Sequence, residues 1–132
     1  MQNSPRWLSI EEIIETNREQ VTLTGEDHII LDLGGLDSAA HNPRMAFDYG
    51  GEDDVIVLAV SLFLAINRNH PFVQGNKRTA WLSALQFLAS NGYVTSLPDI
   101  DEFAEFLTRV ATGEIERELL EYFLWRCSSP VT

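Results

Sequence analysis

Residues 70–80 combine a histidine, a glycine and two adjacent cations in a pattern that suits the binding of a phosphate. The stretch reads His-Pro-Phe-Val-Gln-Gly-Asn-Lys-Arg-Thr-Ala. Pro71 forces an extended turn where the preceding helix ends, and Gly75 permits a backbone conformation that other residues resist. Lys77 and Arg78 then fall in the first turn of the next predicted helix.

These two cations occupy the end of a helix where positive charge is unfavourable. Cations at a helix N-terminus oppose the helix dipole, at a cost of about 0.3–1 kcal/mol each. Two other predicted first turns contain acids instead, Asp53–Asp54 and Asp101–Glu102. Free backbone N–H groups, the positive end of the dipole and both cations would together bind an anion, and a polyphosphate is the natural one.

His70 directly precedes this predicted anion site. Its neutral imidazole can take a proton from an incoming hydroxyl as that hydroxyl attacks phosphorus. Most phosphoryl-transfer sites also hold a metal through a carboxylate, but the position facing the loop, Gln74, is an amide. Asn76 is placed to cap the following helix. An ordinary interpretation stays open, in which the histidine only makes a structural hydrogen bond and Gly75-Asn76 is a common turn.

Hydrophobic periodicity predicts one all-α domain over residues 1–132, with about six helices and a short irregular or β-like segment before the second clear helix. The first half is expected to contain a helix over Ser9–Glu19 opened by a Ser9–Glu12 capping box, a strand or extended loop at His28–Leu31, a turn at Gly34–Gly35, and a short helix over Leu36–His41 ended by Pro43. The second half is expected to contain a buried central helix from Asp53–Asp54 to Asn69, a helix from Asn76 to Asn91–Gly92, a helix begun by Asp99 and ended by Gly113, and a last helix over Ile115–Arg126.

Composition narrows the classes of function. The net charge of −11 repels phosphate backbones, so direct binding of DNA or RNA is not expected, whereas a basic partner would suit this surface. The longest apolar run, Val55–Ile66, is too short for a membrane helix, which needs roughly 20 residues. No apolar signal-peptide core follows Met1, so a cytoplasmic location is expected. The single cysteine, Cys127, cannot form an internal disulfide and is expected to be a small buried hydrophobe.

Residues 70–80, together with the FLASNGY string at residues 87–93, resemble the Fic/Doc family, and in particular its Doc (death-on-curing) branch. The Doc-like pattern is close to H-x-F-x-D-[AG]-N-K-R-T-A, followed by an apolar helix that ends in N-G-Y. Residues 32–39 and Pro43 are similar to a second Doc pattern, R-D-x-G-L-L-E-S-A. The resemblance covers Leu31–Tyr93 in motifs and implies the Fic fold, a small helical bundle whose motif loop joins two central helices.

The resemblance also implies an activity. Fic enzymes usually transfer AMP to a target hydroxyl, whereas Doc-like members carry lysine in place of a second glycine. They are toxins that use ATP to phosphorylate a threonine of elongation factor Tu and so stop translation. The Lys77-Arg78 pair puts this chain on the Doc side. In the roles that the resemblance implies, His70 is the base, Phe72 anchors the loop in the core, and the nucleotide phosphates are held by Gly75, Asn76, Lys77 and Arg78.

Doc toxins pair with a small antitoxin of the Phd type, whose C-terminal segment folds into a groove on the toxin. Fic enzymes that inhibit themselves carry the pattern [S/T]-x-x-x-E-[G/N], which is not found in this chain. The resemblance therefore implies an inhibitor on a separate chain.

Two departures from the Doc pattern leave alternatives open. Gln74 replaces the acidic residue expected to bind Mg²⁺, and an amide oxygen can ligate Mg²⁺ but brings no charge, so metal affinity should fall. Leu31 and Gly35 replace an arginine and a leucine in the segment that would position the target. An active toxin kinase comes first among the hypotheses. A catalytically impaired binding protein and an AMP-transferring Fic enzyme are the alternatives.

Overall fold

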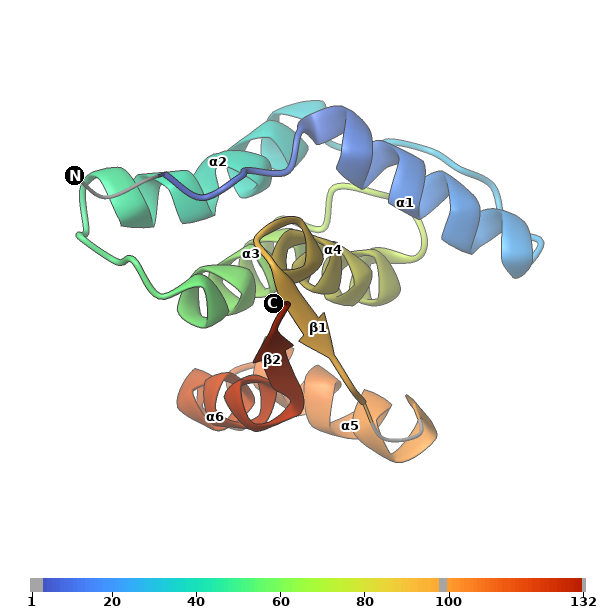
Figure 1. The fold of residues 1–132 in the computed structure, drawn as a ribbon. Helices are drawn as coiled ribbons and strands as arrows, with labels where there is room; N and C mark the ends of the chain where they lie inside the picture. The colour runs from blue at the N-terminus through green and yellow to red at the C-terminus, as the bar shows by residue number, and fades with distance from the viewer. Residues whose placement is uncertain (1–3, 98–99, 132) are drawn as a thin grey trace.

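The computed structural model describes residues 4–97 and 100–131. Within them, helices dominate and the strands form one small antiparallel pair, so the prediction of an all-α fold is confirmed (Figure 1). The elements are α1 (Ile10–Leu23), α2 (Leu33–Asp48), α3 (Val55–Asn69), α4 (Asn76–Ser90), β1 (Tyr93–Thr95), α5 (Ile100–Ala111), α6 (Arg117–Cys127) and β2 (Ser128–Pro130). Among the described residues, no helix combines the length and the apolar content needed to cross a membrane.

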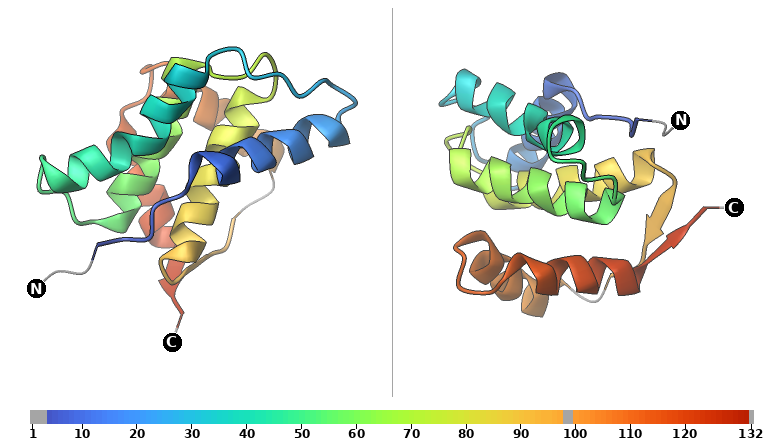
Figure 2. Two further views of the ribbon diagram at one scale, coloured as in Figure 1. Left: turned by 90° about the horizontal axis from the view of Figure 1, so that it is seen from above. Right: turned by 90° about the vertical axis from the view of Figure 1, so that its left-hand side faces the viewer.

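The helices form three layers, with α3 and α4 in the middle (Figure 2). The α1 and α2 helices cover one side of this central pair, and α5 and α6 cover the other. The prediction that α3 is the buried central helix is confirmed, because its apolar side chains are buried on all sides. A helix can bury side chains all round only when neighbours pack on every face. The central layer therefore fixes both ends of the loop that joins α3 to α4.

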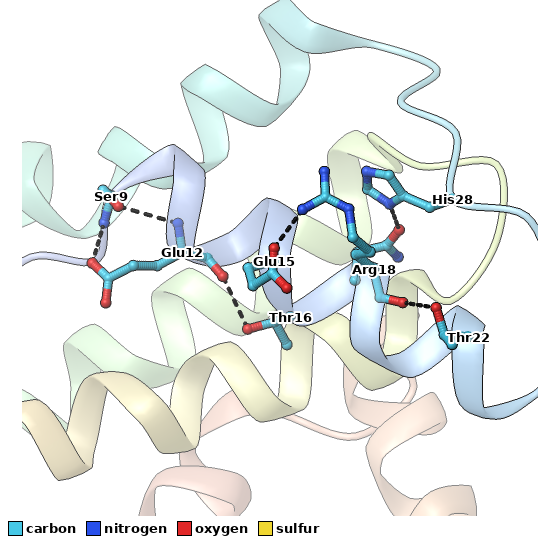
Figure 3. Close-up of polar contacts among 8 residues, drawn as sticks. Ser9, Glu12, Glu15, Thr16, Arg18, Thr22 and His28 are labelled. Atoms are coloured by element: carbon cyan, nitrogen blue, oxygen red, sulfur yellow. Dashed lines mark hydrogen bonds and ion pairs between the residues drawn. The ribbon is translucent and has the colours of Figure 1, made fainter.

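The α1 helix begins at its predicted cap. The Ser9 hydroxyl accepts a hydrogen bond from the Glu12 backbone N–H at 3.1 Å, and the Glu12 carboxylate accepts one from the Ser9 N–H at 3.0 Å (Figure 3). This reciprocal pair satisfies two backbone donors that a helix start leaves without partners. The helix continues to Leu23, one turn beyond the predicted end near Glu19.

The prediction of a turn at Gly34–Gly35 and of a short helix ended by Pro43 is wrong. Both glycines lie in the first turn of α2, and Pro43 is buried inside that helix. The Asp32 carboxylate accepts a hydrogen bond from the Gly35 N–H at 2.8 Å, and a Cβ on Gly35 would lie 2.6 Å from that carboxylate. The glycines thus allow a tight N-cap, while packing of α2 on α3 outweighs the roughly 3 kcal/mol that an interior proline costs.

The segment at His28–Leu31, expected to be a strand or an extended loop, is an extended loop with one β-bridge, between Ile30 and Phe72. Two smaller features differ from the expectation. The pairing of β1 with β2 was not predicted, and Cys127, which precedes β2, is half-buried where a buried side chain was expected. The predicted helix start at Asp99 lies outside the described residues.

The α1 helix forms a wall behind the loop between α3 and α4. Gly75, which precedes α4, has a left-handed backbone with φ of +78°. A Cβ at this position would lie 3.1 Å from both Asn17 Nδ2 and Val21 Cγ1, and those two side chains are fully buried. Gly75 therefore meets two requirements at once, a backbone that side chains resist and a close approach to α1.

Substitution of Gly75 by alanine is expected to destabilise the protein more than the same change at Gly113. Gly113 has a similar φ of +81° but has no atom within 4 Å of an added Cβ. Gly113→Ala should lower the free energy of unfolding by about 1–2 kcal/mol, because alanine resists a left-handed backbone. Gly75→Ala should lower it by about 1 kcal/mol or more beyond that, because the added Cβ also displaces Asn17 and Val21. Urea denaturation measures both free energies of unfolding. Equal losses would show that α1 does not crowd the loop.

Candidate functional site

The loop between α3 and α4 begins with an unusual backbone conformation. His70 ends α3 with φ of 45° and ψ of 57°, and among the described residues it alone, apart from glycines, has a positive φ. Its N–H donates to the carbonyl of Ile66 at 3.0 Å. A residue other than glycine is held in this region only when its surroundings enforce it, and such residues cluster at functional sites.

Asn76 bonds back into the loop, so the prediction that it caps α4 is wrong. Gly75 is the N-cap, and no side chain caps the helix. The buried Asn76 amide instead accepts from the Phe72 N–H at 3.0 Å and donates to the Phe72 carbonyl at 2.7 Å. These two bonds close the loop around a single residue, Phe72, whose side chain is fully buried.

The orientation of Asn76 also determines which nitrogen of His70 carries a lone pair. The Phe72 N–H can only donate, so Asn76 Oδ1 faces it and Asn76 Nδ2 is a donor. That Nδ2 lies 3.3 Å from His70 Nε2, so Nε2 must accept. The contact fits a neutral imidazole with its proton on Nδ1. That lone pair accepts from Asn76 in this structure, so His70 Nε2 can take a proton from a hydroxyl that replaces Asn76 as its donor.

The segment before α2 lies along the other side of the loop. The Pro71 carbonyl accepts from the N–H groups of Leu31 and Asp32 at 2.8 Å and 3.0 Å, and the Val73 N–H donates to the Ile29 carbonyl at 3.0 Å. These bonds satisfy backbone groups that belong to neither helix. The loop is therefore held by backbone pairing on one side and by Asn76 from within.

A cavity of about 640 Å³ opens where the loop meets α4, the end of α1 and the end of α5. It is lined by most of the site residues that the sequence predicted, namely His70, Gln74, Gly75, Asn76, Lys77 and Arg78. Phe72 does not line the cavity but lies beneath it, in the core. The first backbone bond within α4 runs from Thr79 N–H to the Gly75 carbonyl at 2.9 Å, so the N–H groups of residues 76–78 precede the helix ladder. Backbone donors and two cations thus meet at one opening, which is suited to a polyphosphate.

The donor set fits a protein-held Mg²⁺ poorly. Glu26 supplies the single carboxylate among the residues that line this cavity, and the loop position Gln74 offers only an amide. Across the described part of the chain, no group of three or more His, Cys, Asp or Glu side chains is placed to hold a metal. Mg²⁺ usually requires one or two carboxylates in addition to substrate phosphates. The chemistry of this site is therefore built on protein cations and backbone donors.

A second cavity, of about 490 Å³, adjoins the first. The two share Gln20, Lys77 and Arg78. The wall of the second cavity is mainly apolar and is contributed chiefly by α4 and α5, with Phe63, Trp81, Leu82, Ala104, Leu107 and Thr108. The two cations thus stand between a polar opening and an apolar groove.

Two residues beside the loop were missed by reasoning from the sequence. Asn17 is fully buried on α1, where it donates a hydrogen bond to the loop, and His28, in the extended segment after α1, bonds Asn17. The available signal was the row Ile13, Asn17 and Val21 at helical spacing, which places one amide within an apolar stripe. The other histidine, His41, lies on α2, donates to the Asp37 carbonyl, and lines a separate cleft.

Comparison with known proteins agrees with this geometry. The model of the Fic/DOC family matches residues 7–88. The protein named Toxin Doc from Mycolicibacterium smegmatis is 36% identical over 90 residues, which cover 66% of this chain and 68% of that protein. Protein kinase doc from Escherichia phage P1 is 31% identical over 110 residues, which cover 83% of this chain and 86% of that protein. The chain therefore belongs to the Fic/DOC family, and its similarity to these two proteins places it in the Doc branch.

Proposed function

We propose that this protein is a Doc-like toxin, a phosphotransferase that uses ATP to phosphorylate a protein hydroxyl and so inhibits translation. The observation that carries the proposal is that His70 Nε2, with its lone pair, adjoins a cavity lined by the α4 N-terminus and two cations. The relative named Protein kinase doc supports transfer of phosphate. Elongation factor Tu is the proposed target because the Doc-like motif resembles toxins that act on it.

In the proposed reaction, the ATP phosphates bind at the start of α4. The backbone N–H groups of residues 76–78 point toward an anion there, Lys77 supplies a compact charge, and Arg78 can donate two parallel hydrogen bonds. The target hydroxyl takes the place of the Asn76 N–H at His70 Nε2, its oxygen attacks the γ-phosphorus, and its proton passes to Nε2. The bond between the γ-phosphorus and the bridging oxygen breaks, and ADP leaves with that electron pair.

The surface beside the loop suits a protein substrate. Four large apolar side chains are exposed along the paired backbone segments next to the site: Ile29 at 47%, Leu31 at 63%, Leu33 at 59% and Val73 at 42%. Several exposed apolar side chains at the rim of a polar site are typical of a surface that contacts another chain. It would bring the target hydroxyl close to His70.

Replacement of His70 by alanine is expected to abolish the transfer of label from γ-labelled ATP to elongation factor Tu. Loss of a general base should lower the rate by about 10²–10⁴-fold. His41→Ala is the matched control, since His41 lies on α2 in a separate cleft and should leave the rate unchanged. Each variant is assayed for label on the target and for growth arrest on expression.

Two results of that assay would contradict the proposal. No transfer from γ-labelled ATP to any lysate protein, with Mg²⁺ or Mn²⁺ present, would exclude a kinase. Transfer of label from the α position of ATP would instead identify an AMP-transferring enzyme, the function against which Lys77 argues.

A catalytically impaired binding protein is the second candidate, and Gln74 favours it. Replacing Gln74 by aspartate should lower the Mg²⁺ concentration needed for half-maximal transfer, because a carboxylate brings the charge that an amide lacks. Gln20→Asp is the control, since Gln20 lines the same cavity from α1 and lies outside the loop. Activity that appears only in Gln74→Asp would establish the impaired form, and equal responses of both variants would point to a general effect of added charge.

We further propose that a Phd-like antitoxin binds the apolar groove between α4 and α5. The groove ends at Lys77 and Arg78, so a segment bound there would reach the cations of the phosphate site. Ala104→Glu places a charge in the groove and should reduce rescue of growth by the antitoxin while leaving phosphate transfer intact. Ala89→Glu, at an exposed position of α4 outside the groove, is the control. Full rescue of the Ala104→Glu variant would exclude this groove.

A further inference from the structure

We propose that Asn17 and His28 are positioning residues that keep the peptide bond between Gln74 and Gly75 in the orientation required for phosphate binding. This inference rests on the proposed function for its purpose, and on the contacts of a buried amide for its geometry. Neither residue lies in the 70–80 motif, and they reach the loop from behind, through α1.

Both amide hydrogens of the Asn17 side chain are donated in hydrogen bonds. Its side chain is fully buried, and its Nδ2 donates to the Gln74 carbonyl at 2.9 Å and to Thr79 Oγ1 at 3.0 Å. A backbone carbonyl can only accept, so the identity of Nδ2 is determined by this contact. Asn17 therefore connects α1 to the loop and to the first turn of α4 at once.

His28 fixes the other end of the same amide. Asn17 Oδ1 faces His28 Nδ1 at 2.7 Å, so Nδ1 must be the donor. The ring is half-buried, and its centroid lies 5.9 Å from that of Phe72. Figure 3 shows the ring of His28, from the loop after α1, turned back onto that helix. Without this donor, a buried oxygen would lack its partner, which costs about 1–3 kcal/mol.

The tether at the Gln74 carbonyl also orients the next N–H group. In a trans peptide the C=O and N–H point in opposite directions. Because the Gln74 oxygen points to Asn17, the Gly75 N–H points away from α1. A glycine permits the reverse orientation at little cost, since both backbone conformations are open to it. That reversal would turn a carbonyl oxygen toward the bound phosphates, so Asn17 selects the orientation that an anion tolerates.

Two substitutions of His28 separate its hydrogen bond from its ring. His28→Phe keeps a ring against Phe72 but removes the donor to Asn17. His28→Asn removes the ring but keeps a side-chain N–H close to the position of Nδ1. The readouts are the affinity for ATP with Mg²⁺ and the amide hydrogen exchange of residues 74–78 in the free protein, with α3 amides reporting global unfolding.

The positioning role predicts a loss in His28→Phe alone. That variant should bind ATP about threefold to tenfold more weakly, which corresponds to one hydrogen bond, and exchange at residues 74–78 should accelerate. The ATP affinity of His28→Asn should stay within about twofold of that of the natural protein. Exchange at residues 74–78 should accelerate by more than exchange of the α3 amides, because a change in overall stability alone would move both sets equally.

Other patterns would overturn the inference. Weaker binding in His28→Asn alone, or equal loss in both variants, would mean that the ring matters and the donor does not. If His28→Phe keeps the ATP affinity and the loop hydrogen exchange of the natural protein, then neither the ring nor the donor of His28 positions the loop. If the natural protein does not bind ATP, the proposed function fails, and hydrogen exchange at residues 74–78 still decides whether His28 and Asn17 hold the loop.

Discussion

Two buried side-chain amides, Asn17 and Asn76, hold the backbone of the loop between α3 and α4, and the site depends on them. A loop that reverses direction between two central helices cannot use either helix ladder, yet its buried polar groups must be satisfied. Asn76 satisfies both backbone groups of Phe72, and Asn17 donates to the backbone carbonyl of Gln74. Backbone pairing with residues 29–32 satisfies the outer edge. The loop conformation is thus enforced from three directions.

This enforcement explains how the chain tolerates two unfavourable features at the same place. His70 has a left-handed backbone, which costs of order 1–3 kcal/mol, and Lys77 and Arg78 oppose the dipole of α4. Both features face the cavity, whereas Asn17 lies in the core behind it and Asn76 is buried at the cavity wall. Tight packing of α3 against α4 stabilises the fold. The strained backbone of His70 and the charges of Lys77 and Arg78 lie at the ends of the same two helices.

The sequence predicted the structure correctly where the residues that determine it are close together along the chain. The capping box of α1, the apolar α3 and the cations of the motif each lie within a few residues. It failed where a distant contact decides the structure. Pro43 should end a helix, but packing of α2 on α3 carries the helix through it. Asn76 was expected to be a cap because asparagine is a common one, whereas the turn at Phe72 takes both of its polar atoms. The partner of Asn17 across the core could not be read from spacing, nor could β2, since Ser128–Pro130 has no strand pattern.

The same contacts separate the shape of the loop from its chemistry at position 74. The tether to Asn17 uses the backbone carbonyl of Gln74, while the side chain of Gln74 is exposed beside the cavity. A change of side chain at this position therefore alters the charge of the site without releasing the loop. An aspartate there would neutralise part of the positive field of Lys77, Arg78 and the α4 N-terminus, whereas glutamine leaves that field whole. A loop of this kind can keep its backbone shape while the charge of the site changes.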